Sequence, residues 1–596
     1  MSHPYGVQPG GNQFFAPPHS ADARVGGLGG MRAVGDPTVL TILRCLGGVA
    51  LGRLACVSRG LYVFAHFDDM WRDLTLSAYG GRVIFRTSWK ATWVESTLAR
   101  RSGAANAAAV VVDDDAAAPT TGGSGSGRGR AWDRGQEAVR SSSGAEEEIG
   151  AIATDYRWVH DPIVVSGFYS DYLYQWWRCA SYSIDPAWVA PRQGRRSIER
   201  CSAAVLSAED FNQRFGAPNK PVVITDCVTE WGAFGSWSLA SFAERFGSTA
   251  FHANGYTFTM DDYVTYARGV EDAMAPRGER GCVVGHDRPL YLFDSKFTEA
   301  APALASEFEV PMYFRDDLFS VLGEEMRPNY RWLIVGPARS GSIWHTDPNA
   351  TSAWNAVISG AKKWILYPPE VVPPGVHPSP DGALVGGPLS PLEWLLDFYD
   401  EATGLGVPDA RRPLECVCRA GELIYVPTGW WHAVINVEPS IAITQNFVDR
   451  HNLPAVMQFL RQDLELVSGV PGRSDAEVAA LAGLMEEGIA AKRPDLLPVL
   501  TKDHGAVWSP RARSRGVAVG GAGGGEKEKE KGKGTGSTRS VVEGTGLSSI
   551  VWRGPPGSRR SGGGGSSSSS NGGDVVAAAP SEPVEKKPCF RFNFGN

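Results

Sequence analysis

The stretch from Tyr156 to Asp449 constrains the fold of this chain more than any other feature. It is dense in tryptophan, tyrosine and β-branched residues, which favour strands, and it lies between segments of much simpler composition. Short apolar runs of strand length recur along it, at 221–225, 332–335, 364–367, 423–426 and 441–448. This pattern predicts a β-rich domain as the main folded unit.

Composition sets apart the two ends of the chain and one internal stretch. Residues 1–35 are rich in Gly, Pro and small side chains, and residues 99–150 and 511–596 are of low complexity. Such segments bury too little apolar surface to offset the chain entropy lost on folding, so we expect all three to be disordered. The remainder of the 596-residue chain exceeds what one core needs, which predicts more than one compact region.

Two stretches outside the β-rich region have helical periodicity. Between residues 36 and 98 apolar side chains recur at helix-like intervals, which predicts a small all-α module. Ser474 and Glu477 have the S-x-x-E spacing of a capping box, and apolar residues then repeat every three or four positions. We expect helices at 466–510, which would cover the β-rich domain or support a dimer.

Charge, cysteine spacing and hydropathy exclude several classes of protein. A formal net charge of -7 argues against a globally basic nucleic-acid binder. The nine cysteines contain no CxxC pair, which argues against a zinc ribbon or a dithiol redox site. No apolar run reaches the ~18 residues of a membrane span, and the first residues lack the features of a signal peptide, so we expect an intracellular protein.

A histidine and an aspartate stand two residues apart at His345 and Asp347. In a strand this spacing places both side chains on one face. His432 follows far later, directly ahead of the apolar run 433–437, and strand pairing would return it to the first two residues. Two histidines and one carboxylate leave three positions of an octahedral iron open, as an oxygenase needs for a keto acid and dioxygen, whereas a structural zinc site is closed.

Lys362 opens a second strand-like run shortly after this pair. A lysine that points inward requires an anion to compensate its charge. The distal carboxylate of 2-oxoglutarate would be that anion, with hydroxyl groups of Ser342, Tyr291 or Thr444 completing its hydrogen bonds. The alternative is a solvated lysine at a sheet edge.

Two segments that contain these residues resemble a known family. GPARSGSIWHTDPNATSAWNAVISGAKKWILYPPE and GELIYVPTGWWHAVINVEPSIAITQNF resemble the JmjC oxygenases of the bifunctional arginine demethylase and lysyl hydroxylase group. The resemblance implies a mainly β fold, the double-stranded β-helix of cupins and jelly rolls, with flanking helices. It also implies that the Fe(II) ligands are His345, Asp347 and His432. The implied contacts to 2-oxoglutarate are Tyr291, Ser342, Asn355, Lys362 and Thr444. Asn446 would lie beside the iron.

The region before the barrel resembles a second family. The short helices expected in VLTILRCLGGVALGRLACVSRGLYVFAHFDDMWRDLTL resemble an F-box, although Asp36-Pro37 stands where Leu-Pro is usual. With GFYSDYLYQWWRC, the whole chain resembles plant F-box/JmjC proteins, which implies a Skp1-type adaptor as a partner. The alternative is a small helical bundle packed elsewhere on the protein. The implied units are an F-box-like module at 36–98, the first part of the oxygenase region at 151–300, the JmjC domain at 301–465 and C-terminal helices at 466–510.

What the resemblance implies for function is an Fe(II)- and 2-oxoglutarate-dependent protein oxygenase that uses O2, either a histone or protein arginine demethylase or a lysyl hydroxylase. We expect a nuclear enzyme whose substrate presents basic side chains from a histone tail or a splicing-factor region, with no membrane or nucleic-acid partner. The alternative is a ubiquitin-ligase adaptor in which the barrel only recognises substrate. Because the stretch at 99–150 separates the helical module from the barrel, removing residues 1–150 should leave the chemistry in place.

Tryptophans close to the predicted site have two interpretations. Trp344 is larger than the residue usual before the first ligand, and it would reshape a pocket wall if it points inward. Four others would either form an aromatic cage for a methylated cation or pack in the core, and the core is favoured because they lie in strands; they are Trp354, Trp364, Trp430 and Trp431.

Overall fold

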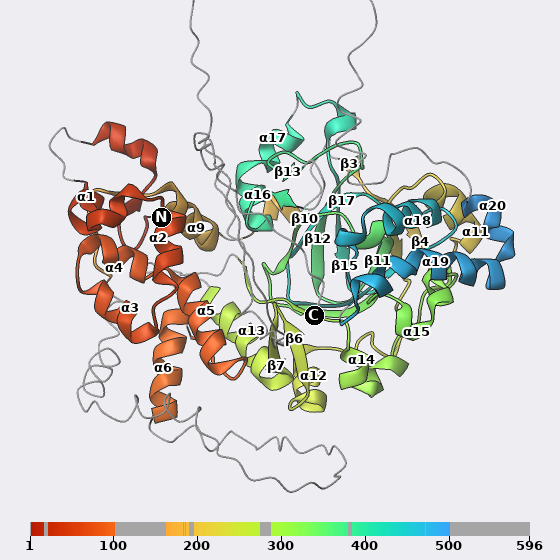
Figure 1. Ribbon diagram of the computed structural model, residues 1–596, viewed down its shortest axis with the longest axis horizontal. Coiled ribbons are helices and arrows are strands. Elements are labelled where there is room, and N and C mark those ends of the chain that lie inside the picture. Colours follow the sequence, from red (N-terminus) through yellow and green to blue (C-terminus); the bar gives the residue numbers. More distant parts are fainter. Residues whose placement is uncertain are drawn as a thin grey trace, which may run out of the picture.

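The computed structural model describes most of the chain up to residue 500. The described ranges are 2–16, 22–86, 88–101, 162–182, 184, 186–189, 196–274, 288–379, 384–404, 406–470 and 472–500. Nearly all of the linker expected at 99–150, and the whole tail expected at 511–596, lie outside them. In Figure 1 a group of helices lies on the left and the β-rich body on the right. No helix in these ranges has the length and apolar character needed to cross a membrane.

The body contains two mixed sheets, one of five strands and one of nine. In spatial order the five-stranded sheet contains β10 (Gly341–His345), β17 (Trp431–Asn436), β12 (Ala361–Tyr367), β15 (Leu414–Arg419) and β3 (Arg196–Ser197). The nine-stranded sheet contains β4 (Glu199–Ser202), β5 (Val222–Thr225), β16 (Leu423–Val426), β11 (Ser352–Ser359), β18 (Ser440–Phe447), β9 (Arg331–Gly336), β8 (Leu292–Asp294), β6 (Ala250–Ala253) and β7 (Tyr256–Thr259). All five runs predicted as strands lie in these sheets.

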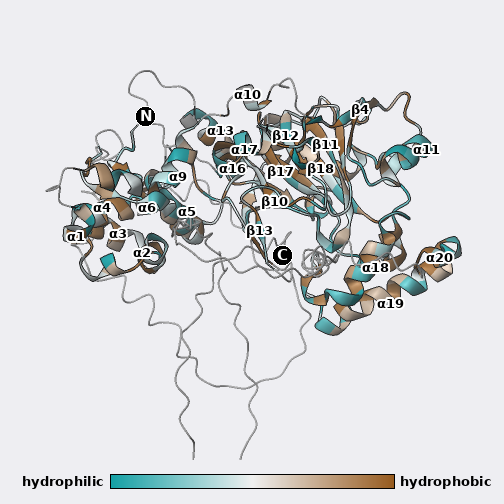
Figure 2. Ribbon diagram, turned by 90° about the horizontal axis from the view of Figure 1, so that it is seen from above, coloured by the Kyte–Doolittle hydropathy of each residue, from teal (hydrophilic) through white to brown (hydrophobic). Residues whose placement is uncertain are grey.

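The two sheets face each other and enclose an apolar core, as in a jelly roll. Val223 of β5 and Val357 of β11 pack there with Trp364 of β12 and Val434 of β17. The central strands are buried on both faces, and Figure 2 shows them coloured largely as hydrophobic. The mainly β architecture expected from the sequence is therefore confirmed.

Side chains of β12 alternate between the two faces of its sheet. Lys362 and Trp364 point between the sheets, and Lys362 is fully buried. Lys363 points outward and forms an ion pair with Glu415 of β15. This two-residue period decides which lysine enters the barrel.

Helices cover the outer faces of both sheets. α16 (Pro391–Asp397) and α17 (Tyr399–Thr403) pack on the five-stranded sheet, whereas α12 (Leu239–Phe246) and α13 (Met260–Met274) pack on the nine-stranded sheet. At the C-terminal end, α18 (Leu453–Gln462) packs against α19 (Asp475–Lys492). The predicted capping box of Ser474 and Glu477 begins α19, with both of its hydrogen bonds present. Helices therefore follow the barrel, as expected, up to α20 (Leu497–Leu500), and residues 501–510 of the expected segment lie outside the described ranges.

The region before the barrel is helical, as expected. It contains α2 (Asp36–Leu43), α3 (Gly48–Ala55), α4 (Arg59–Ala65), α5 (Asp68–Tyr79) and α6 (Trp89–Arg101). The expectation that this module is separate from the barrel is wrong, because one continuous apolar core runs through both. Trp89 stacks on Tyr266 of α13 with ring centroids 5.6 Å apart, and Phe85 meets the same tyrosine edge-on at 5.5 Å.

Residues 1–35 also differ from the expectation of disorder. β1 (Val7–Gln8) pairs in parallel with β2 (Phe168–Tyr169), and α1 (Ala23–Gly27) follows. Val7 and Leu28 are buried in the common core. The partner strand comes from a segment distant in the sequence, so local composition could not reveal this pairing.

Candidate active site

The three predicted metal ligands lie close together where β10 ends and β17 begins. His345 ends β10 and His432 is the second residue of β17, and the two are direct register partners. Asp347 follows β10 by two residues. One ligand atom from each of the three residues can be chosen so that all lie within 4.8 Å of one another. Strand pairing thus brings the two histidines together. Asp347 completes the trio from beyond the end of β10, whereas the spacing predicted that it would lie in the same strand as His345.

Backbone carbonyl groups orient both imidazole rings. The Nδ1 atom of His345 lies 2.7 Å from the carbonyl oxygen of Ile343, and that of His432 lies 3.1 Å from the carbonyl oxygen of Trp430. A carbonyl oxygen only accepts, so a neutral ring must carry its proton on Nδ1 and its lone pair on Nε2. The Nε2 atom of His432 lies 3.9 Å from a carboxylate oxygen of Asp347. Each ring therefore offers a metal-binding nitrogen with its second nitrogen already fixed.

Burial controls the protonation of these groups. Burial, and then the neighbouring His432, lower the pKa of His345 to about 3, and burial lowers the pKa of His432 to about 4. Burial raises the pKa of Asp347 to about 6, opposed by His345 and by a hydrogen bond from Asn446. The other carboxylate oxygen, Oδ2, is buried without a hydrogen-bond partner among the described residues. Two neutral imidazoles and a carboxylate with an unsatisfied buried oxygen fit a divalent iron.

Lys362 lines the same cavity and is fully buried. Its Nζ atom donates to the hydroxyl of Tyr291 and to the side-chain oxygen of Asn436, both at 2.8 Å. Both partners are neutral, and no described carboxylate forms an ion pair with this lysine. Burial lowers the pKa of Lys362 to about 7. An anionic ligand would therefore gain a strong charge-assisted bond here.

All eight residues predicted for the site line one cavity, together with Asn446 and a group of mostly apolar side chains. That group is Phe293, Ile334, Ala353, Trp364, Val426 and Val434. The side-chain oxygen of Asn355 is buried without a hydrogen-bond partner among the described residues, and Thr444 donates to the carbonyl of Trp354 at 2.9 Å. Polar atoms for a dicarboxylate and an apolar wall thus line one cavity.

Asn436 is a site residue that sequence reasoning missed. It is fully buried and accepts a hydrogen bond from Lys362. A signal was present, because His432, Val434 and Asn436 have the two-residue spacing of one strand face. A polar residue on the face that carries a metal ligand indicates a role in the site.

The tryptophans divide between core and cavity. Trp344 points away from the cavity and packs on Trp394 of α16, with ring centroids 4.9 Å apart, so it does not reshape the pocket wall. Trp354, Trp430 and Trp431 lie in apolar clusters, in agreement with the core interpretation. Trp364 differs, because it also lines the cavity and lies 5.9 Å from the His432 ring.

Comparison with known proteins identifies the family. Residues 208–452 match the family described as Cupin-like domain. The chain is 40% identical over 476 residues to the arginine-specific demethylase JMJ22 of Arabidopsis thaliana, covering 80% of this chain and 79% of that protein. The chain belongs to the JmjC oxygenase family. This JmjC oxygenase is also 32% identical over 318 residues to the bifunctional arginine demethylase and lysyl-hydroxylase psr-1 of Caenorhabditis elegans, covering 51% of this chain and 71% of that protein.

A third relative names the cofactors. The JmjC oxygenase is 30% identical over 282 residues to the human 2-oxoglutarate and iron-dependent oxygenase JMJD4, covering 44% of this chain and 63% of that protein. Membership of this family makes the protein an enzyme that uses Fe(II), 2-oxoglutarate and O2. The cofactors predicted from the sequence are confirmed.

Proposed function

We propose that this JmjC oxygenase demethylates N-methylated arginine side chains of a protein substrate. In this proposal His345, Asp347 and His432 hold the iron. The co-substrate contacts come from Tyr291, Ser342, Asn355, Lys362 and Thr444. The observation that carries the proposal is the presence of a buried lysine and a two-histidine, one-carboxylate cluster in the lining of one cavity.

Bound Fe(II) supplies the redox chemistry by which dioxygen is split, 2-oxoglutarate is decarboxylated to succinate and a substrate C–H bond is hydroxylated. The protein's own residues bind the iron, orient the co-substrate and exclude water. His345 and His432 present neutral nitrogens, and Asp347 adds the negative charge that favours a divalent cation. Lys362 neutralises the distal carboxylate of the co-substrate, which sets the direction in which its keto acid end points. Apolar walls such as Trp364 and Val434 keep water from the reacting atoms.

Two features support a basic side chain as substrate. JMJ22, which aligns with four fifths of the chain, is named an arginine-specific demethylase. The acidic balance of the chain, with a net charge of -7, favours encounter with a cationic segment such as a histone tail or a splicing-factor region. A hydroxylated N-methyl group breaks down to formaldehyde and the demethylated nitrogen, so the product is distinctive.

The test uses purified full-length protein with Fe(II), 2-oxoglutarate and ascorbate. Histone peptides with methylated arginine are compared with matched unmethylated peptides that contain lysine, and products are followed by mass and by formaldehyde release. Loss of a methyl group with release of formaldehyde is the expected result. A lysine that gains one oxygen, without demethylation, would assign the enzyme to lysyl hydroxylation instead. Consumption of 2-oxoglutarate with neither product would overturn the basic-substrate proposal.

An adaptor role for the helical module and a nuclear location stay predictions. Ile42 and Val57 of this module are 47% and 69% exposed, which leaves apolar surface for a partner. Co-purification of a Skp1-type adaptor with the full chain tests the first. Imaging of the tagged full chain in cells tests the second.

A further inference from the structure

We propose that Arg288 and Arg339 are positioning residues for 2-oxoglutarate. Lys362 has two hydrogen-bond partners, Tyr291 and Asn436, and each arginine anchors one of them to helices that precede the barrel. The inference rests on the proposed role of Lys362 in holding the co-substrate. It gives the N-terminal helices a part in the oxygenase site.

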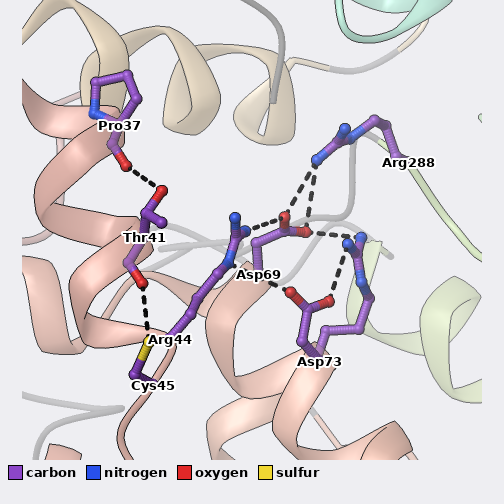
Figure 3. Close-up of polar contacts among 8 residues, drawn as sticks. Pro37, Thr41, Arg44, Cys45, Asp69, Asp73 and Arg288 are labelled. Atoms are coloured by element: carbon purple, nitrogen blue, oxygen red, sulfur yellow. Dashed lines mark hydrogen bonds and ion pairs between the residues drawn. The ribbon is translucent and has the colours of Figure 1, made fainter. Parts of the chain in front are cut away.

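Arg288 anchors the Tyr291 side. Its guanidinium nitrogen lies 3.4 and 3.5 Å from the two carboxylate oxygens of Asp69 on α5, as Figure 3 shows. Its Cζ atom lies 3.8 Å from the ring centroid of Trp176 on α9 (Asp171–Ser181). Asp69 is held in turn by Arg44 and Arg72, at 3.3 and 2.6 Å. The anchor is thus a planar group fixed by charge on one side and by an aromatic face on the other.

The backbone between Arg288 and Tyr291 is also held. The amide of Leu290 donates to the hydroxyl of Tyr266 at 2.8 Å, and the hydroxyl of Tyr263 donates to the carbonyl of Leu290 at 3.0 Å. Tyr266 is the residue on which Trp89 of the helical module stacks. The segment between the Arg288–Asp69 ion pair and the Tyr291 hydroxyl, which accepts from Lys362, is therefore held by hydrogen bonds along its length.

Arg339 anchors the Asn436 side. Its guanidinium donates to the carbonyls of Cys179 and Ala180 in the last turn of α9, at 2.6 and 3.1 Å. Its own amide donates to the carbonyl of Asn436 at 2.7 Å, and the Asn436 side chain donates to Ser340 at 2.9 Å. Arg339 has a positive φ of 72°, a backbone conformation that is uncommon for a residue other than glycine.

Both anchors converge on α9. Trp176 lies in its middle and supports Arg288, and its last carbonyls support Arg339. Lys362 donates to both anchored acceptors, which together fix the position of its ammonium group. Loss of either anchor would let one acceptor shift and would weaken the bond from Lys362 to a carboxylate, because charge-assisted bonds require close geometry.

The experiment distinguishes an effect of the arginines on co-substrate binding from an effect on the stability of the whole fold. The variants are Arg288→Ala, Arg288→Lys and Arg339→Gly, in the full-length protein. Lysine keeps the charge facing Asp69 but loses the planar face on Trp176, and glycine accepts the positive φ while removing the guanidinium. Arg461→Ala is the matched control, because Arg461 forms an exposed ion pair with Glu486, each 44% exposed. Binding of 2-oxoglutarate is measured by calorimetry with Mn(II) in place of iron, alongside KM, kcat and melting temperature.

We expect Arg288→Ala and Arg339→Gly to raise Kd and KM for 2-oxoglutarate about 10-fold, with kcat at saturating co-substrate changed less than about 2-fold. Arg288→Lys should lie between these variants and the wild type. Mn(II) affinity and the Arg461→Ala control should match the wild type. If Arg288→Ala does not fold, Arg288→Lys and Arg339→Gly carry the test.

Two results with the arginine variants would overturn the inference. One is an unchanged affinity for 2-oxoglutarate in the folded variants. The other is a fall in Mn(II) affinity and kcat as large as the fall in co-substrate affinity, which would make these arginines general supports of the fold. Lys362→Ala serves as the reference: if it binds 2-oxoglutarate as the wild type does, the proposed role of Lys362 fails, and this inference with it.

Discussion

His345 on β10 and His432 on β17 are register partners at the edge of the five-stranded sheet, with ring centroids 4.1 Å apart. Backbone hydrogen bonds between the two strands fix the separation of the two rings. Sites built on paired strands hold their geometry better than sites built on loops. Of the proposed ligands, only Asp347 lies beyond a strand end.

Replacing a proposed ligand should abolish turnover without unfolding the protein. His345→Ala and Asp347→Ala each remove a donor that faces the cavity rather than the apolar core, so the folded state should persist. Succinate production measures turnover, and thermal melting measures folding. Undiminished succinate production by either variant would contradict the assignment of the metal site.

Replacing Lys362 should weaken co-substrate binding much more than metal binding. Lys362→Ala removes a charge-assisted partner of a carboxylate, a loss of about 1.5–3 kcal/mol or roughly 10- to 150-fold in affinity. Lys363→Met is the matched control, because the neighbouring lysine pairs with Glu415 on the outer face of the same strand. That variant should lower the melting temperature and leave calorimetric binding of 2-oxoglutarate unchanged. If both variants weakened 2-oxoglutarate binding equally, the anion would have to bind elsewhere.

Affinity for 2-oxoglutarate should fall as the pH rises above 7. Burial lowers the pKa of Lys362 from 10.5 to about 7, so the charged form that binds an anion becomes the minor form above that pH. Binding then requires uptake of a proton, and Kd should rise by up to about tenfold per pH unit. Calorimetry from pH 7 to 9 measures this slope. Lys362→Arg keeps its charge throughout this range. If titration of Lys362 causes the pH dependence, the Kd of this variant should not change with pH.

Removing the helical module should destabilise the oxygenase region, contrary to the expectation from the sequence. Deletion of residues 1–150 would expose Tyr266 and the other apolar side chains of α13 against which Phe85 and Trp89 pack. Exposed apolar surface of this kind lowers stability and promotes aggregation. Solubility and melting temperature measure the effect, with deletion of residues 110–150 alone as the control. A soluble truncated protein with normal melting would show that the two regions fold independently.

The strands and the metal cluster could be predicted because both follow a local rule. Alternation with a period of two residues identifies the buried strands, and the short H-x-D spacing keeps Asp347 close to His345 although Asp347 lies beyond the end of β10. The alternation also places Lys362 on the inner face of β12, where the structure has it. The strands and the site residues that they carry can therefore both be predicted from a short stretch of sequence.

The supports of the site could not be predicted in this way. Arg288 meets Asp69, and Arg339 meets Cys179, across long separations in the sequence. The pairing of Val7 with Phe168 is of the same kind. Such contacts depend on how whole elements pack, and a run that is rich in glycine and proline looks disordered until its partner strand is known.

The two adjacent lysines of β12 show where this protein cannot change its length. Lys362 and Lys363 have the same side chain, yet one lies by the co-substrate cavity and the other balances Glu415 on the opposite face. Deleting or inserting one residue just before this strand would turn each lysine to the face opposite its present one, and would turn Trp364 and every other side chain of the strand to the wrong face as well. Variation in length among descendants of this sequence should therefore collect between β12 and β15, at residues 368–413, where added residues leave the alternation intact.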